Sequence, residues 1–392
     1  MKLRKLLVVL SFAAAGCAAA FAGTSSIAIT APAITSLSYS GTSATPATIS
    51  NLNSQLSTLF GQVQSYLDST YFSKLHDLGE LSEGFANANT AASNNPDIMG
   101  YENYKIFSFF VGSSLGFALP ALTAAQFNNL GTNIINNGDM YGGLGTGGIA
   151  GQLGINTSRF LVRNLYLSLK FGIFNLPNTN LPSNMSGDIH QLLLGLGVNY
   201  KLVSPSPDIW GGLVEWRGLS LGTGIEYSRD TLNMNVGLTS QTYSGSFSDP
   251  NYPGGTVPVS ATIQNAKANL DVVASSFIVP VEVDTSIQFL WVFNLGLGAG
   301  ADINLPFSTI AINGSGTTWI GLPSQYTYTE TPGSVSVNAT DSKNTPGFWD
   351  YVSPKLSADL GFNISIVKID IPVAFYPLTK AVSLGIIGGV AW

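Results

Sequence analysis

The stretch that decides the fold is residues 380–392, KAVSLGIIGGVAW. Every second residue from Val382 to Trp392 is mostly large and apolar, and the residues between them are mostly small. Successive side chains of a β-strand point to opposite faces, so this period predicts a strand. One apolar face and one face of small residues suit the lipid-facing wall of a membrane barrel, and an ordinary core strand is the alternative.

The same alternation recurs upstream. The runs are residues 165–173, 192–200, 219–227, 293–301 and 356–366. Every charged residue within these runs falls on the face of small residues, as a lipid-facing wall requires, because a Lys or Arg on the lipid side at mid-bilayer costs about 2–4 kcal/mol. The pattern therefore predicts an all-β fold, a transmembrane antiparallel β-barrel of about 14 strands between residue 101 and the end.

Charged residues on the small face are candidates for the barrel lumen. They are Lys170, Glu226, Asp230, Glu282, Asp284, Asp302, Asp359 and Asp370, with Lys368 beside the last of them. A polar lumen must hold such charges paired or wet, so structural packing is the first interpretation. The functional interpretation is a network that sets selectivity or locks a plug.

The composition agrees with a membrane barrel. Only 10% of the 392 residues are charged, against about 25% in soluble domains. The mean hydropathy is +0.26, yet the chain after its first 22 residues shows no unbroken run of about 20 apolar residues. The rival interpretation is a transmembrane helix over residues 107–119, where Gly112 and Gly116 form a helix-packing motif.

The N-terminus reads as a cleavable signal peptide of residues 1–22. A basic start at Lys2, Arg4 and Lys5 precedes a short apolar run, and residues 20–22 (AFA) form a cleavage site. Export of a barrel predicts the outer membrane of a Gram-negative-type envelope. Lipidation at Cys17, the only cysteine, is the alternative to cleavage. The remaining chain would carry 13 basic and 22 acidic residues, a net charge of −9 that argues against nucleic acid.

Residues 23–100 are expected to form a lead-in and a plug, ahead of the barrel at residues 101–392. Residues 23–50 read as a loose lead-in, residues 51–68 as an amphipathic helix and residues 84–100 as a turn-rich connector. The candidate plug residues are Leu52, Leu56, Leu59, Val63, Leu67, Asn95 and Pro96. Two polar stretches, residues 240–258 and 313–347, are expected to be long outer loops.

Three segments resemble a known family. They are GFANANTAASNNP (residues 84–96), residues 275–303 and residues 368–392. Together with the plug, barrel and aromatic end, they resemble the outer-membrane long-chain fatty-acid transporters of the FadL type, in particular a divergent spirochaetal branch. That family has an Asn-Pro-Ala signature in its plug, whereas here Asn95 and Pro96 are followed by Asp97. The resemblance implies a plugged barrel whose terminal Trp392 is read by the barrel assembly machinery.

Catalysis and cofactors are not expected. Asp188 and His190 could be drawn into a hydrolase, but a packing or loop role is the simpler interpretation of two isolated histidines in the chain. Gly143, Gly145 and Gly148 match a dinucleotide motif without its following helix, and strand curvature explains them better. No metal-ligand spacing occurs in the sequence.

The expected function is passive uptake of hydrophobic small molecules, with long-chain fatty acids as the leading candidate. Its partners would be the lipid bilayer and the hydrophobic ligand, and the sequence does not predict an oligomeric state. A general diffusion porin for hydrophilic solutes and a surface-exposed binding or structural barrel stay open as alternatives. A plug favours the first, since an open pore needs none.

Overall fold

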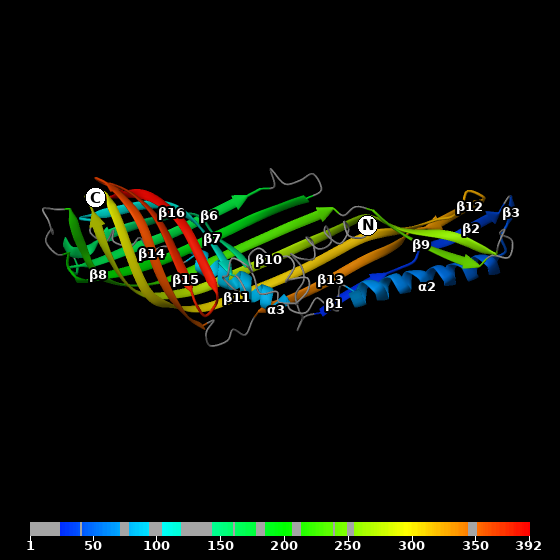
Figure 1. Cartoon of the computed structure of the whole chain (residues 1–392), viewed down its shortest axis with the longest axis horizontal. Coiled ribbons are helices and arrows are strands. Elements are labelled where there is room, and N and C mark those ends of the chain that lie inside the picture. The colour runs from blue at the N-terminus through cyan, green and yellow to red at the C-terminus, as the bar shows by residue number, and fades with distance from the viewer. Residues whose placement is uncertain are drawn as a thin grey trace.

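The computed structural model describes residues 24–39, 41–70, 78–93, 104–118, 143–159, 161–177, 185–205, 213–237, 240–248, 255–343 and 351–392. Within these ranges the protein is an elongated β-structure with two helices of more than ten residues (Figure 1). Its main sheet has 13 strands, and ten of them close into a ring. The ring strands are β4 (Phe107–Ala118), β5 (Gly143–Asn156), β6 (Leu165–Leu176), β7 (Met185–Val203), β8 (Val214–Gly237), β10 (Thr256–Phe289), β11 (Phe293–Gly321), β14 (Val352–Ile364), β15 (Val367–Tyr376) and β16 (Ala381–Ala391).

Every neighbouring pair in the ring is antiparallel, which confirms the all-β barrel. β16 pairs with β4, with Val390 opposite Phe109, and β10 pairs with β11 along almost its whole length. The sequence predicts about 14 strands, and the described sheet contains 13. Ten of these form the wall. The other three pair with the parts of β10 and β11 that continue beyond it, because these two strands are 34 and 29 residues long.

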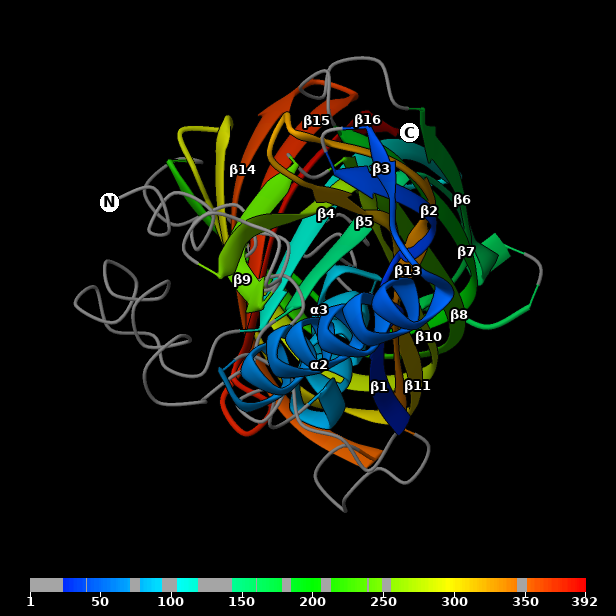
Figure 2. The ribbon, with the colours of Figure 1, turned by 90° about the vertical axis from the view of Figure 1, so that its right-hand side faces the viewer.

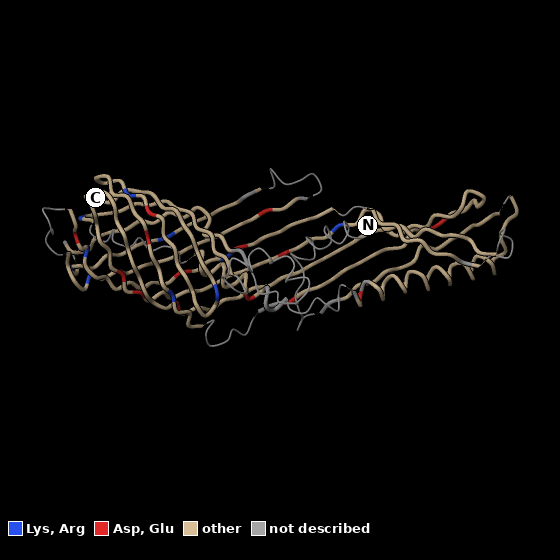
Figure 3. The backbone as a smooth tube through the Cα atoms, in the orientation of Figure 1, with Lys and Arg blue, Asp and Glu red and all other residues tan. Residues whose placement is uncertain are grey.

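The barrel wall alternates as the sequence predicts. Large apolar side chains such as Ile173, Leu196 and Ile386 are exposed on the outside. Small and polar side chains on the inside are buried, and charged residues are sparse along the whole backbone (Figure 3). Residues 107–118 form strand β4, paired on both sides, so the rival interpretation as a transmembrane helix is wrong. No helix in the described ranges has the length and apolarity to cross a membrane.

Beyond the ring, β10 and β11 carry a second folded part, here called the extension (Figure 1). Three strands join them there: β1 (Thr24–Ile29), β13 (Gly333–Lys343) and β9 (Gln241–Ser248). A separate sheet contains β12 (Tyr326–Thr331), β2 (Ala33–Tyr39) and β3 (Thr42–Ser43). The extension lies at the end of the barrel opposite to the one where β16 ends.

The extension corrects two expectations. The lead-in is not loose, because residues 24–43 contribute β1, β2 and β3. The two polar stretches are not long loops, because most of their described residues lie in β9, β10, β11, β12 and β13. The physical reason is that Ser and Thr alternate there with apolar residues, as at Val257 and Val259, whose side chains are buried while the polar ones face outward.

Helix α2 (Pro46–Thr70) belongs to the extension and not to the lumen, which corrects its expected role as the plug. Its apolar stripe contains Leu52, Leu56 and Phe60, each at most 2% exposed, which pack against β2, β10, β11 and β12. Val63 is also buried, and Leu59 packs at the edge of the same core. The stripe finds its apolar partner on the curled sheet of the extension, and so has no need of the barrel interior.

Side-chain amides of α2 also cover the free strand edges of the extension. Gln64 Oε1 accepts a hydrogen bond from Ile29 N–H (3.2 Å), and its Nε2 donates to Ile27 O (3.0 Å), on edge strand β1. Gln55 Oε1 accepts from Ser248 N–H (3.3 Å) on the opposite edge strand, β9. An uncovered edge invites pairing with another chain. Helix α2 therefore closes the five-stranded sheet of the extension.

Helix α3 (Leu78–Ser93) lies inside the ring (Figure 2). It contacts seven of the ring strands, β4, β5, β8, β10, β11, β15 and β16, and also β13 of the extension. The sequence predicts a connector from residue 84 onward, which is wrong as far as Ser93. Gly and Asn are poor helix formers in isolation, but here the surrounding wall buries Ala86, Ala88 and Asn89 and overrides that preference.

Candidate functional site

The candidate site is the barrel lumen filled by α3. The helix backbone packs directly on glycines of two adjacent wall strands. A Cβ at Gly116 or at Gly145 would collide with the carbonyl of Ala88, and one at Gly147 would come within 2.9 Å of Ala92 O. The wall therefore forms a seat that only glycine permits. The glycines on the small face of these strands therefore allow the α3 backbone to come close to the wall, in addition to allowing the strands to curve.

Hydroxyl and amide contacts fix the helix on the other sides. Ser82 and Ser308 hydrogen-bond through their hydroxyls. Thr90 Oγ1 and Ser276 Oγ lie 2.8 Å apart, and Asn89 reaches Ser228 on β8. Ser114 on β4 donates to Ala92 O at 2.6 Å. These are neutral contacts, each contributing about 0.5–1.5 kcal/mol.

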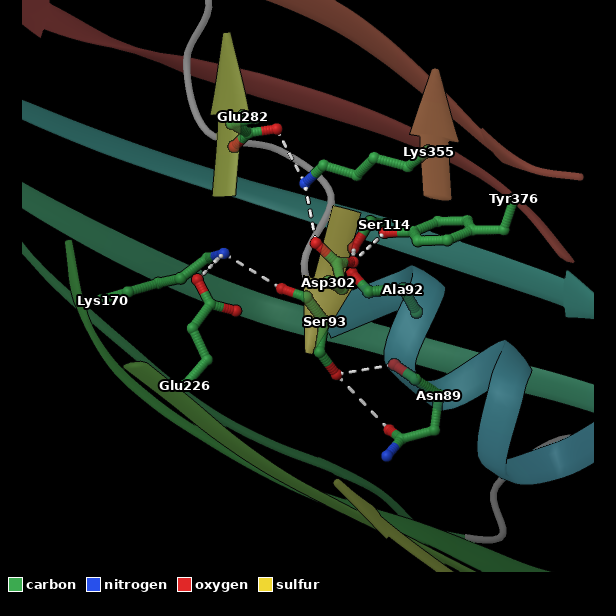
Figure 4. A network of polar contacts seen from close by, with 10 residues as sticks. All are labelled: Asn89, Ala92, Ser93, Ser114, Lys170, Glu226, Glu282, Asp302, Lys355 and Tyr376. Atoms are coloured by element: carbon green, nitrogen blue, oxygen red, sulfur yellow. Dashed lines mark hydrogen bonds and ion pairs between the residues drawn. The ribbon is translucent and has the colours of Figure 1, made fainter. Parts of the chain in front are cut away.

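One buried charge holds the C-terminal end of α3 (Figure 4). Lys170 Nζ on β6 donates to Ser93 O, the last carbonyl of the helix, at 3.0 Å. The same ammonium pairs with Glu226 on β8 at 2.8 Å, and the two side chains are 8% and 5% exposed. A cation is favourable at a helix C-terminus, where the helix dipole is negative. Lys170, Glu226 and the Ser93 carbonyl are called the latch from here on.

A second buried cluster lies across the lumen. Lys355 Nζ on β14 is 2.7 Å from Glu282 Oε2 and 3.3 Å from Asp302 Oδ1. Tyr376 donates its hydroxyl proton to Asp302 Oδ2 at 2.8 Å. In the close view this cluster and the latch both lie at the C-terminal end of α3, near Ala92 and Ser93 (Figure 4). Tyr376 also packs on Ala91 of the helix, so the second cluster supports α3 through an aromatic ring.

All eight candidate lumen residues lie on ring strands, but not in one network. The latch contains Lys170 and Glu226, and the second cluster contains Glu282 and Asp302. Asp230 Oδ2 accepts a hydrogen bond from Thr146 N–H at 2.9 Å, beside the glycine seat. The others, Asp284, Asp359 and Asp370, are buried further toward the end where β16 ends. Asn294 donates to Asp359 at 3.4 Å.

Sequence reasoning missed Lys355, Tyr376 and the seat. Lys355 falls on the same alternate face as Asp359, so extending the run on β14 by one residue would have found it. The helical nature of residues 84–93 had no local signal, and the seat follows only from the contact of α3 with β4 and β5.

Next to the latch the lumen contains a cavity. It is lined on the inside by Phe110, Leu193 and Ile387 together with Gln152 and Lys170. Phe110 and Ile387 contact each other and are buried. This cavity therefore offers an apolar surface with one ammonium group at its border.

The remaining candidate positions carry no chemistry of their own. His190 Nε2 pairs with Asp188 Oδ2 at 2.7 Å, and both side chains are about half exposed at one end of β7. Gly145 and Gly148 lie in β5, where Gly148 has a φ of +52° beside a register shift. Within the ranges described, no group of three or more His, Cys, Asp or Glu residues could hold a metal ion.

Trp392 completes the ring at its seam. Its carbonyl accepts hydrogen bonds from Ile106 N–H (2.7 Å) and Phe107 N–H (3.1 Å), and its ring lies edge-on to Phe107. Its role as an assembly signal remains a prediction. The predicted signal peptide with Cys17, and the candidate plug residues Asn95 and Pro96, lie outside the described residues, as does the side chain of Leu67.

The chain belongs to the Lsa36-like family, whose model matches residues 19–390. Among proteins of curated function, no sequence match is found.

Several solved structures are similar in fold. The toluene transporter TbuX of Ralstonia pickettii is 10% identical, with 80% of this chain and 98% of that chain covered and a TM-score of 0.24. The toluene transporter TodX of P. putida is 8% identical, with coverages of 78% and 94% and a TM-score of 0.25. The translocator domain of the autotransporter NalP from Neisseria meningitidis is 9% identical, with coverages of 78% and 93% and a TM-score of 0.25. The resemblance to the FadL-type transporters therefore rests on the sequence and the layout of this chain, because TM-scores this low carry no argument about its family or its ligand.

Proposed function

We propose that the protein is an outer-membrane channel for passive uptake of hydrophobic small molecules, and that α3 is its plug. One observation carries this proposal: the C-terminal half of α3, residues 86–93, consists of small residues inside the ring and is held at its end by a single buried lysine. A purely structural core would be expected to use large apolar side chains, which fill space and cannot leave. Ala and Ser side chains with a few hydroxyl contacts suit an element that moves.

The inner wall beside the latch supports an apolar ligand, because Phe110, Leu193 and Ile387 line the small cavity there. Lys170 is held by Glu226 and the Ser93 carbonyl while α3 is in place, so it could meet an acidic head group only after α3 moves. Long-chain fatty acids are the leading candidate. An open diffusion porin is disfavoured by a filled lumen, because hydrophilic solutes need a continuous water path.

The test compares conductance with uptake. In planar bilayers the intact protein should show almost no steady conductance. In proteoliposomes it should take up a long-chain fatty acid faster than an unrelated barrel does, and it should not take up glucose. Large steady conductance together with glucose uptake would assign the protein to the general porins.

The extension favours a second candidate, a surface-exposed binding or structural role. It has a hydrophobic core of its own, built around Leu56 and Phe60 of α2, which a channel does not require. Because it lies opposite to the end where β16 ends, the extension is expected on the outer side of the membrane. Protease treatment of intact cells should then cleave the extension and leave the ring protected, whereas protection of both parts would count against surface exposure.

A further inference from the structure

The ring has an unusual set of turns at the end where β16 ends. The turn between β10 and β11 has Leu290 and Trp291 as its central residues, with φ angles of +52° and +63°, and Val292 N–H donates to Phe289 O at 3.1 Å. Both central residues are thus left-handed, the conformation for which hairpin turns use Asn-Gly. A bulky residue with positive φ is a strained outlier. Such strain persists where the side chains have a use.

These two side chains are exposed, at 51% and 62%. The neighbouring described turns at this end are apolar as well. Their exposed large side chains are Leu161 and Val162 between β5 and β6, Leu213 before β8, Ile364 and Ile366 at the turn between β14 and β15, and Trp392. A turn that projects into water would carry polar residues instead.

The apolar outer face of the barrel continues into the turn between β10 and β11. On β11 the outward side chains Phe293, Leu295 and Leu297 are exposed and lead up from the turn. Trp is enriched where a membrane protein meets the lipid head groups. In the described turns of this end, the charged residues classed as exposed are Lys105 and Arg163, and both are basic, which suits lipid phosphates.

We propose that this end of the barrel does not reach water but lies within the head-group layer of a phospholipid leaflet. In this arrangement Leu290 and Trp291 insert below the phosphates, while Lys105 and Arg163 lie level with them. The lumen mouth at this end then opens onto lipid. A hydrophobic molecule that passed the plug would leave into the leaflet without crossing water.

The test measures the depth of Trp291 in proteoliposomes made of the full-length protein and phosphatidylcholine with phosphatidylglycerol. The tryptophan fluorescence of the wild type minus that of the Trp291→Phe variant is the emission of Trp291 alone. Phospholipid brominated on the acyl chain near the glycerol should quench that difference at least twofold, and aqueous acrylamide should leave it nearly unchanged. Trp319, on the extension, is the matched control: the difference for Trp319→Phe should respond to acrylamide and not to bromolipid.

The double variant Leu290→Asn, Trp291→Gly checks that the effect is not misfolding. It supplies the residues that a left-handed turn favours, so the heat-modifiable folded band should persist while the bromolipid-quenched part of the emission falls. Quenching of Trp291 by acrylamide would place the turn in water and overturn the proposal. Protection of Trp291 from both quenchers would assign the turn to a protein partner and would also overturn it.

Discussion

Replacing Lys170 with Met tests whether the latch holds the plug. The substitution keeps the apolar stem and removes the ammonium that pairs with Glu226 and donates a hydrogen bond to Ser93 O at the end of α3. In the plugged state Glu226 then remains buried without its cation, and the Ser93 carbonyl loses its donor. When α3 leaves, water enters the lumen and solvates the Glu226 carboxylate. The penalty therefore falls on the plugged state alone.

The size of the effect follows from the burial of the pair. Breaking a buried ion pair by removing one partner costs about 3–5 kcal/mol, and side chains that are 8% and 5% exposed belong in that class. A cost of about 3 kcal/mol should raise the unplugged fraction about 100-fold, because every 1.4 kcal/mol changes the equilibrium constant about tenfold.

A thiol at Ser93 would report the unplugged state. Ser93 is fully buried, and its hydroxyl bonds only within the helix in the contacts resolved here, so Ser93→Cys is a mild change. With Cys17→Ser the chain has no other cysteine. The rate of maleimide labelling in proteoliposomes should rise about 100-fold in the Lys170→Met protein, in proportion to its unplugged fraction.

Two controls separate the latch from a general loss of stability. The double variant Lys170→Met, Glu226→Met removes both charges and should label within several-fold of the parent, because replacing a whole buried pair by apolar residues is often neutral. Lys267→Met, at an exposed lysine of the extension, should leave the rate unchanged. A rate for Lys170→Met within about threefold of the parent would refute the role of the latch.

Three further predictions concern the seat, the extension and the seam. Gly116→Val should displace α3 and open the channel to ions in planar bilayers, because its Cβ collides with the Ala88 carbonyl, whereas Gly388→Ala, whose Cβ meets only an atom 3.9 Å away, should stay silent. Leu56→Ala should destabilise the extension by about 2–5 kcal/mol. Proteolysis should then cut the extension faster while the ring keeps its heat-modifiable band, and faster proteolysis of the ring as well would show that the two parts unfold together. Deleting residues 390–392 removes the hydrogen bonds that Trp392 makes with Ile106 and with Phe107 of β4. The deletion should abolish the folded band in outer membranes. Normal surface levels would show that this end is only a packed strand.

The barrel wall was predictable because each strand shows the alternation of apolar and small residues within its own sequence. Alternation places Leu196 outside and Lys170 inside whatever the neighbouring strand is. The charges of the lumen followed from the same rule, since a lipid-facing lysine is costly.

The plug was not predictable, because its signal is not local. The apolar stripe of α2, with Leu52, Leu56 and Phe60, predicts that the helix packs against an apolar surface. It does not indicate which surface, and in the structure that surface is the sheet of the extension. The C-terminal half of helix α3, residues 86–93, consists of small residues, because it must fit against glycines at 116 and 145. The extension was missed because its Ser and Thr residues resemble loop composition, although Val257 and Val259 alternate with them.

The most direct measurement locks α3 in place and follows uptake. Thr90 Oγ1 and Ser276 Oγ are 2.8 Å apart, so Thr90→Cys with Ser276→Cys, in a Cys17→Ser chain, places two thiols within reach of a disulfide between α3 and β10. Proteoliposomes holding the oxidised protein should take up no long-chain fatty acid above background, and reduction should restore uptake to the level of the single Thr90→Cys control. Equal uptake in the oxidised and reduced states, with the disulfide verified, would contradict the claim that α3 is a movable plug.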